Sequence, residues 1–230
     1  MSVSPSPMHP LDHPVWNALA TRQKDLAEGG ALARRYPPAM VPFAAMTDTS
    51  PESFAALRAL MSPSDIAVFF TTEPITPPDE FKLLMAKTGE QMIGTPAAVP
   101  ADDIVTLGAA DVVAMLELTK LTNPGPFAVR TRELGTFLGI KREGRLVAMA
   151  GERVKPADYT EITAVCVHPD FRGRGYAQML IGAVARQIVA RGEIPYLHVF
   201  SDNHSAIALY LRQGMEIRRR MHITVLGRAD

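Results

Sequence analysis

The spacing of apolar residues in the first hundred positions switches between helical and extended periods. Apolar residues recur every three to four positions over residues 13–29, which predicts a helix with one buried face. Ser50 followed by Pro51 is typical of a capped helix start. The expected elements are helices over residues 13–29, from 50 onward and over 80–86, and strands over 40–46, 66–71 and 91–94. This alternation predicts a small α/β unit.

From residue 103 onward the pattern predicts a longer and more regular series of elements. Residues 141–144 separate two expected strands and have the composition of a hairpin turn. Gly192 follows a long apolar stripe and is a helix stop signal. The expected elements are helices over 109–121, 175–191 and 204–212, and strands over 136–140, 146–151, 161–167, 196–200 and 220–226.

The Pro- and Ala-containing segment 95–103 is typical of a connector between two parts of a chain. We therefore expect residues 1–100 to form an N-terminal α/β segment and residues 101–230 to form a second domain. Residues 1–12, rich in Pro and Ser, are expected to be a loose lead-in.

Composition narrows the class of protein. The chain has 230 residues, of which 47% are hydrophobic and 21% charged, as in an ordinary globular protein. Lys plus Arg equals Asp plus Glu at 24 each, so no basic field indicates nucleic acid as a partner. The single cysteine, Cys166, excludes an internal disulfide. The N-terminus lacks the features of a signal peptide and no run of about 18 apolar residues occurs, so we expect a cytoplasmic protein without a membrane partner.

The candidate chemistry lies in residues 167–177, where a strand ends and a long helix begins among closely spaced glycines. A helix start offers free backbone N–H groups and the positive end of the helix dipole, and glycine lets that backbone approach a phosphate closely. Arg172 and Arg174 add positive charge, so the segment predicts a diphosphate site. Tyr176 follows the last glycine where a Walker motif needs Lys, and Gln178 stands where a dinucleotide fingerprint needs a small residue, so both motifs are excluded.

The remaining pattern, Arg172-x-x-Gly175-x-Ala177, resembles the coenzyme A signature of the GNAT acetyltransferase superfamily. The flanking segments resemble the same family: residues 161–169 are similar to its fourth strand, and Asn203 to Met215 are similar to its fourth helix and the start of the strand that follows. The resemblance covers residues 103 to 228, and the phrase from Ala164 onward is most similar to the FR47-like, glycine N-acyltransferase-related branch. It implies a GNAT fold of the α/β (α+β) class, a mixed and mostly antiparallel sheet whose central strands splay apart.

The resemblance also implies acetyl-coenzyme A as co-substrate. Backbone groups of the fourth strand would bind the pantetheine amides, the glycine-rich loop would hold the diphosphate, and Asn203 would contact the cofactor or cap its own helix. The cofactor-binding residues implied are Val165, Cys166, Val167, Arg172, Gly173, Arg174, Gly175, Tyr176, Ala177 and Asn203.

Tyr210 occupies the family's general-acid position, and a phenol with a pKa of about 10 is protonated at neutral pH. Glu161 is the leading candidate for the general base, with a pKa that we expect partial desolvation to raise. His198 is a rival base, and His168 is more simply structural. Cys166 is expected to be a core residue, because no histidine stands at catalytic spacing from it.

The histidines show no metal-ligand spacing, so no metal is expected. The basic run Arg218-Arg219-Arg220 is typical of a solvated turn. The leading hypothesis is transfer of an acetyl or short acyl group from coenzyme A to a primary amine of a small molecule, by direct attack. Two alternatives stay open: a coenzyme A-binding regulatory module without turnover, and acetylation of a protein N-terminus or lysine. By analogy with two-domain relatives, residues 1–100 are a candidate for a shortened GNAT-like half that walls the acceptor pocket or supports a homodimer.

Overall fold

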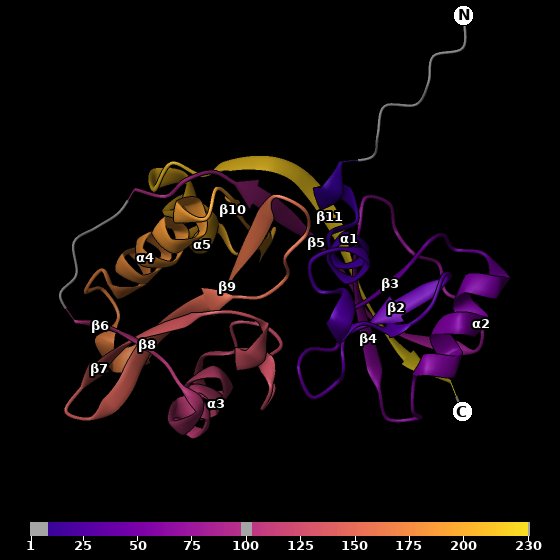
Figure 1. The fold of residues 1–230 in the computed structure, drawn as a ribbon, viewed down its shortest axis with the longest axis horizontal. Helices are drawn as coiled ribbons and strands as arrows, with labels where there is room; N and C mark the ends of the chain where they lie inside the picture. The colour runs from indigo at the N-terminus through magenta and orange to yellow at the C-terminus, as the bar shows by residue number, and fades with distance from the viewer. Residues whose placement is uncertain (1–8, 98–102, 230) are drawn as a thin grey trace, which may run out of the picture.

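Eight strands assemble into one mixed sheet that runs through the whole molecule (Figure 1). The computed structural model describes residues 9–97 and 103–229 of the chain. The strand order is β4-β11-β5-β10-β9-β8-β7-β6, and every described pairing is antiparallel except β9 with β10. The strands are β4 (Ile66–Thr71), β5 (Phe81–Ile93), β6 (Ile104–Thr106), β7 (Phe137–Arg142), β8 (Arg145–Glu152), β9 (Tyr159–Val167), β10 (Ile194–Phe200) and β11 (Glu216–Arg228).

A second, three-stranded sheet and two helices complete the first part of the chain. Its strands pair antiparallel in the order β1-β2-β3, and Phe43, the residue before β3, forms a parallel bridge to Val68 of the large sheet. The elements are α1 (Pro14–Ala20), β1 (Glu28–Gly29), β2 (Ala33–Arg35), β3 (Ala44–Met46) and α2 (Pro51–Leu60). The predicted cap of α2 is confirmed, because the Ser50 side chain accepts a hydrogen bond from the Ser53 N–H.

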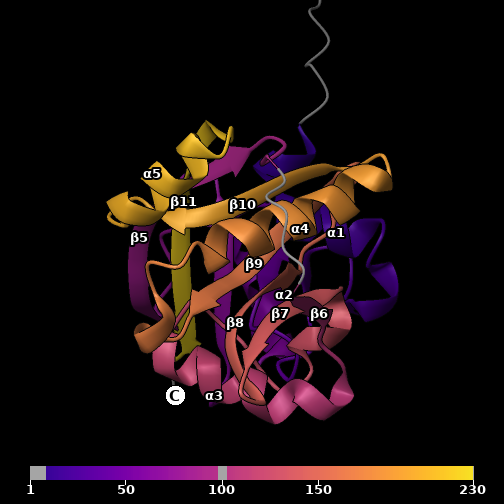
Figure 2. The same ribbon diagram turned by 90° about the vertical axis from the view of Figure 1, so that its left-hand side faces the viewer.

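Helices cover both faces of the half-sheet β6–β9. The long helix α4 (Tyr176–Ala190) packs on β7, β8 and β9, and α3 (Val112–Thr122) lies against β8 and β9 from the other side (Figure 2). Helix α5 (His204–Arg212) lies beside α4 and is tied to it by a hydrogen bond from the Gln213 side chain to the Gln178 carbonyl. The α4 stripe Leu180, Ile181, Val184 and Ile188 is fully buried. The predicted GNAT-type α/β fold is thereby confirmed.

The predicted hairpin over residues 141–144 is confirmed in its turn geometry. Glu143 and Gly144 connect β7 and β8, and both have positive φ, 52° and 78°. Two consecutive left-handed residues define the type I′ turn, whose twist matches that of the strands it joins.

The predicted helix over residues 80–86 is wrong. These residues belong to β5, which pairs with β11 along its whole length, from Phe81 opposite Arg228 to Ile93 opposite Glu216. The segment contains Lys, Leu, Met and Ala, which favour helix, but a ladder to a distant strand overrides local propensity. The short strand expected over 91–94 is the end of this same long strand.

Two other boundaries differ from expectation. The helix expected over 13–29 ends at Ala20, and the strand expected from residue 40 begins only at Ala44. Beyond the end of the helix, the Gln23 side chain makes contacts to distant segments: it donates to the Arg153 carbonyl and accepts from the Tyr36 hydroxyl. Such contacts are invisible in local periodicity.

Strands from both ends of the chain lie side by side. β4 and β5, from the first hundred residues, flank β11 in the large sheet, and β5 also pairs with β10. The division at residue 100 stays a prediction, and most of the expected connector and lead-in, residues 98–102 and 1–8, lies outside the described residues.

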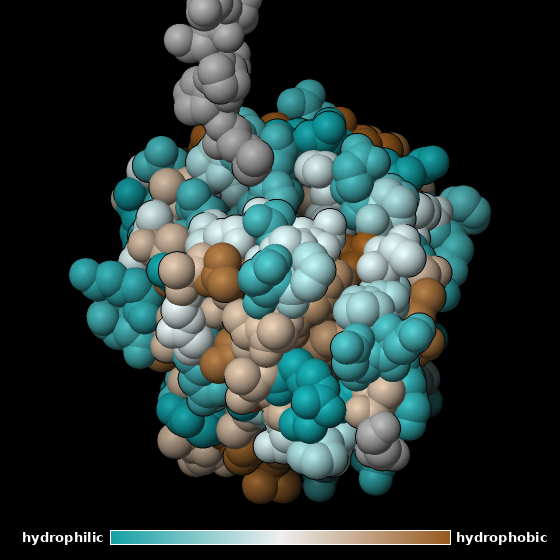
Figure 3. All heavy atoms as spheres, turned by 90° about the vertical axis from the view of Figure 1, so that its right-hand side faces the viewer, coloured by the Kyte–Doolittle hydropathy of each residue, from teal (hydrophilic) through white to brown (hydrophobic). Residues whose placement is uncertain are grey.

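Across the described residues, no helix is both long and apolar enough to cross a membrane. On the face near α2 and the C-terminus, hydrophilic residues are interspersed with hydrophobic ones (Figure 3).

Candidate active site

The central strands β9 and β10 separate soon after they meet. Their parallel pairing covers three positions and ends at Tyr196 opposite Glu161. Beyond that point β10 pairs with β5, and β9 pairs only with β8 on its other side. The predicted splay of the central strands is confirmed.

A bulge in β9 accompanies the splay. The β8–β9 register shifts between Met149 opposite Cys166 and Gly151 opposite Thr163, and Ala164 has a positive φ of 51°. A bulge of this kind bends its strand, and a left-handed alanine is a strained conformation that is found mostly at functional sites. The β9 edge from residue 165 to 167 therefore faces the gap between the strands.

The loop before α4 forms an open cradle of backbone. Gly173 and Gly175 both have φ of 76°, and no atom lies within 4 Å of where a Cβ would stand on either residue. Gly175 is the N-cap of α4, and no side chain caps the helix start. The first-turn N–H groups and the helix dipole are thus directed to an open space that suits an anion.

Two arginines of this loop are exposed beside the cradle. Among the residues described, no carboxylate pairs with Arg172. Arg174 lies over the Phe171 ring, at 4.9 Å from its centroid. A positively charged, glycine-lined helix start fits the diphosphate of coenzyme A, as the sequence predicted.

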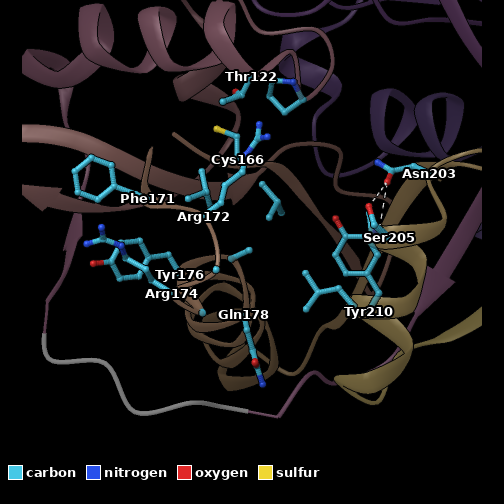
Figure 4. A pocket seen from close by; sticks show the side chains of 18 of the residues that line it. Thr122, Cys166, Phe171, Arg172, Arg174, Tyr176, Gln178, Asn203, Ser205 and Tyr210 are labelled. Carbon is cyan, nitrogen blue, oxygen red and sulfur yellow. Dashed lines mark hydrogen bonds between the residues drawn. The ribbon is translucent and has the colours of Figure 1, made fainter. Parts of the chain in front are cut away.

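A cavity of about 430 Å³, here named the α4 cavity, joins this cradle to the splayed strands (Figure 4). All ten predicted cofactor-binding residues line it. A second wall of the α4 cavity, formed by the end of α3 and the turn after it, was not predicted from the sequence. Asn123-Pro124 had indicated only the end of a helix. The lining residues not predicted are Thr122, Asn123, Pro124, Phe171, Gln178, Ser205, Ala206 and Leu209.

Helix α5 contributes Asn203 and Tyr210 to the α4 cavity. Asn203 caps its helix as expected, with its side-chain oxygen accepting from the Ala206 N–H at 3.2 Å. The Tyr210 side chain reaches the cavity from the next turns, with its hydroxyl directed inward (Figure 4). Burial raises the pKa of Tyr210 to about 12, so the phenol is protonated throughout the physiological range.

A second cavity of about 250 Å³, here named the junction cavity, adjoins the α4 cavity. The two share Asn123, Pro124, Val165, Asn203, Ala206 and Tyr210. Its far walls come from the first part of the chain and from β11, and no motif in the sequence indicated them. These wall residues are Phe43, Val68, Phe70, Met85, Ile223 and Val225.

Glu161 lies behind the junction cavity in a buried ion pair. Its carboxylate accepts from Arg153 at two points, Nε at 2.9 Å and Nη2 at 3.0 Å, and only 1% of Glu161 is exposed. Burial raises the pKa of Glu161, but the Arg153 charge and the hydrogen bonds from His198 and Arg153 outweigh it and lower the pKa to about 2. The expected direction of the shift is therefore wrong: desolvation is present, but the ion pair dominates.

His198 lines the junction cavity in a defined tautomer. The Gln91 oxygen accepts from Arg218 and the Gln91 nitrogen donates to the Leu11 carbonyl, which fixes the orientation of that amide. The Gln91 Nε2 also lies 3.1 Å from His198 Nε2, so His198 Nε2 is the acceptor of this contact. The opposite nitrogen, Nδ1, lies 3.1 Å from Glu161 and carries the proton that it donates to the carboxylate.

Cys166 and His168, the other residues considered for catalysis, are both held in structural contacts. Burial raises the pKa of Cys166 to about 11, in a core cluster beneath α3, as expected for a core cysteine. His168 contacts Arg145 and not the cavities named above. The described portion of the chain contains no group of three His, Cys, Asp or Glu side chains arranged to hold a metal.

The basic run 218–220 is not a solvated turn, as was expected from the sequence. It lies within β11, where Arg218 and Arg219 pair with Asp12 and Arg220 pairs with Glu90. The pairing of this strand with β5 brings these charges next to acidic side chains from the first hundred residues, so local composition was a poor guide.

Comparison with known proteins agrees with the fold. The family model of FR47-like protein matches residues 137–223. N-alpha-acetyltransferase RimI of Mycobacterium tuberculosis is 34% identical over 138 residues, which are 51% of this chain and 84% of that protein. A crystal structure of a GNAT-family protein from Novosphingobium aromaticivorans superposes with a TM-score of 0.91 at 40% identity, covering 97% of this chain and all of that one. A GCN5-related N-acetyltransferase from Kribbella flavida shares the fold, with a TM-score of 0.62 at 15% identity over 94% of this chain and 96% of that one.

The chain belongs to the GNAT acetyltransferase superfamily, in its FR47-like branch. It is an acyl-CoA-dependent acetyltransferase, and GNAT acetyltransferases use acetyl-coenzyme A.

Proposed function

We propose that this enzyme transfers an acetyl group from acetyl-coenzyme A to a primary amine of a small molecule, by direct attack. One observation carries the proposal: Tyr210 lines both the α4 cavity and the junction cavity. A thioester held in the first cavity and an amine held in the second would meet beside its hydroxyl.

The α4 cavity supports coenzyme A in three ways. The open cradle at Gly173 and Gly175, with Arg172 beside it, suits the diphosphate. The splayed β9 edge offers backbone groups to the pantetheine amides, and coenzyme A, when bound, supplies the thioester. Asn203 keeps its side-chain nitrogen available toward the cavity, because its oxygen is the atom that caps α5.

Tyr210 is our candidate for the group that protonates the departing thiolate. Its hydroxyl enters no hydrogen bond within the described residues, and its raised pKa keeps the phenol protonated and its proton available. Burial that raises the pKa of the phenol would also raise that of the thiol formed by C–S cleavage, so the departing thiolate is a stronger base in this cavity than in water.

Glu161 is assigned a positioning role in this proposal. A carboxylate with a pKa of about 2 is a weak base, and Glu161 does not line either cavity. It balances the Arg153 charge and holds His198 in one tautomer. Proton acceptance at His198 Nε2 would require release of its contact with Gln91.

A second candidate function is acetylation of a protein N-terminus, which the name of the Mycobacterium tuberculosis relative suggests. The size of the junction cavity, about 250 Å³, favours the small molecule, and side chains from the first part of the chain, among them Phe43, Phe70 and Met85, contribute to its walls. Thiol release and cofactor binding, measured separately, distinguish these two functions from each other and from a coenzyme A-binding module without turnover.

The purified protein is incubated with acetyl-coenzyme A and, in turn, small amines, amino acids and N-terminal peptides, and release of free thiol is followed. Cofactor binding is measured separately by calorimetry. We expect thiol release with small amines. Faster release with peptides would favour protein acetylation, and cofactor binding without release in any mixture would favour the regulatory module.

A further inference from the structure

We infer that the acceptor is a small amine with an apolar body and no second charged group, and that it binds in its uncharged form. This inference rests on the proposed function and concerns the junction cavity alone. It follows from the walls of the cavity, from its balance of charges and from the state of the groups that face it.

The walls are mainly apolar and come from five strands, β4, β5, β9, β10 and β11. The apolar side chains from β4, β5, β9 and β11 include Val68, Phe70, Met85, Ile162, Ile223 and Val225. Phe70 is packed between two rings, Phe43 at 5.0 Å and His198 at 4.5 Å between centroids. Such a lining favours a ligand whose apolar surface it covers, because burial of apolar surface from water is favourable.

The cavity contains no counter-charge for an ammonium group. Of the side chains that line it, none is a carboxylate, within the part of the chain that the structure describes. Arg153 is its one permanently charged lining residue, and Glu161 directly behind balances that charge. An ammonium ion would lose its hydration here and gain no ion pair, whereas a neutral amine pays only a small desolvation cost. A carboxylate on the ligand would face an arginine that already has its partner.

No group facing the cavity is poised to take a proton from an ammonium ion. The titratable side chains that line it are His198, Tyr210 and Arg153. His198 uses its free lone pair to accept from Gln91, and Tyr210 and Arg153 are protonated. The amine must therefore lose its extra proton to solvent before it reacts.

The transfer balances without a further base. The nitrogen of the neutral amine attacks the thioester carbon, the N–C bond forms and the C–S bond breaks. Tyr210 gives its proton to the departing sulfur and recovers one from the nitrogen, so that the products are a neutral amide and a neutral thiol.

The test uses matched amines with acetyl-coenzyme A. 2-Phenylethylamine is compared with phenylalanine, which adds a carboxylate to the same body, and hexylamine with 1,6-diaminohexane, which adds an ammonium. We expect kcat/KM to be at least about tenfold higher for the apolar member of each pair. Recalculated for the concentration of neutral amine, kcat/KM for 2-phenylethylamine should be independent of pH between 6.5 and 8.5.

Substitutions in the wall of the junction cavity test whether the acceptor binds there. Phe70→Ala should raise the KM for 2-phenylethylamine and leave the Kd of acetyl-coenzyme A unchanged. Phe127→Ala is the matched control, because Phe127 is also half-buried with an edge-on aromatic partner but does not line the cavity. Val68→Thr, which keeps the shape and adds one hydroxyl, gives a second measurement if Phe70→Ala does not fold.

The outcomes separate the two proposals. Absence of cofactor binding, or of thiol release with every amine, would overturn the proposed function. Thiol release that is faster with phenylalanine, with the diamine or with a peptide would keep the transferase activity and overturn this inference. Equal effects of Phe70→Ala and Phe127→Ala on KM would remove the junction cavity as the acceptor site.

Discussion

Arg153, which lines the junction cavity, and Glu161 form a two-point ion pair, with 2.9 Å between Nε and Oε2 and 3.0 Å between Nη2 and Oε1. Arg153 is the residue after β8, and Glu161 lies in β9, so a strand connection brings them together. The pair balances the charge of Arg153, which lines the junction cavity, with that of Glu161, which does not. Glu161, which the sequence indicated as a candidate base, therefore has a positioning role in the proposed mechanism.

Replacement of Glu161 by glutamine should destabilise the protein. Removal of one partner of a buried pair leaves an uncompensated charge, which costs about 3–5 kcal/mol. The pKa of Glu161 is lowered in the folded state, from 4.5 to about 2, so its contribution to the free energy of unfolding is present above pH 4.5. It is lost as the pH falls through about 2.

Urea unfolding of the wild type and Glu161→Gln across this pH range checks the prediction. The difference in the free energy of unfolding between the wild type and Glu161→Gln should be largest at neutral pH and should shrink below pH 4.5. Glu117→Gln, an exposed glutamate of α3, is the control and should show no difference. A large fall in kcat for Glu161→Gln with unchanged stability would instead restore Glu161 as the general base.

Two glycines at opposite ends of α4 allow the phosphate cradle to be tested against backbone strain. Gly175 and Gly192 both have φ of 76°, and a Cβ on either would meet nothing within 4 Å. Alanine at each should lower the free energy of unfolding by about 1–2 kcal/mol, because an L-residue resists positive φ. Only Gly175→Ala should also raise the Kd of acetyl-coenzyme A, by about tenfold or more, since its methyl group enters the cradle.

Calorimetric titration with acetyl-coenzyme A, combined with thermal unfolding, separates the two effects. Similar losses of affinity in both variants would show that strain, and not the cradle, is responsible.

Arg172→Gln should weaken cofactor binding through lost charge. An arginine that pairs with a phosphate makes charge-assisted hydrogen bonds worth about 1.5–3 kcal/mol, so we expect the Kd to rise at least about tenfold. The loss should shrink at high salt, where exposed charges are screened. Arg186→Gln, an exposed arginine further along α4, is the matched control. A Kd that is insensitive to Arg172 at low salt would contradict the diphosphate site.

Tyr210→Phe removes the proposed acid and keeps the ring. We expect kcat to fall by about 10²-fold or more, with the Kd of acetyl-coenzyme A unchanged. Tyr159→Phe, which removes a hydroxyl outside both cavities, should keep full activity. Thiol release under saturating cofactor and amine measures both variants, and full activity in Tyr210→Phe would exclude the acid role.

The elements predicted from sequence were correct where the signal was local. β4 has the predicted bounds, α4 lies between the predicted glycines, and the hairpin turn has the expected conformation. The prediction was wrong for residues 80–86, whose composition favours a helix while β11, more than a hundred residues away, imposes a strand. The coenzyme A cradle was predictable because its glycines and arginines occupy one short segment.

By itself, the sequence determined the family, the glycine-lined start of α4 that we propose as the cofactor cradle, and the helix that carries Tyr210, because each depends on residues a few positions apart. Only the tertiary structure decided the walls of the junction cavity, the proposed acceptor site. Phe70, Met85 and His198 meet in one cavity through the ladder that joins β4, β11, β5 and β10, and Arg153 reaches it from the segment after β8. The protonation state of Glu161 was decided in the same way, because electrostatic energy depends on the distance in space between charges and not on their separation along the chain.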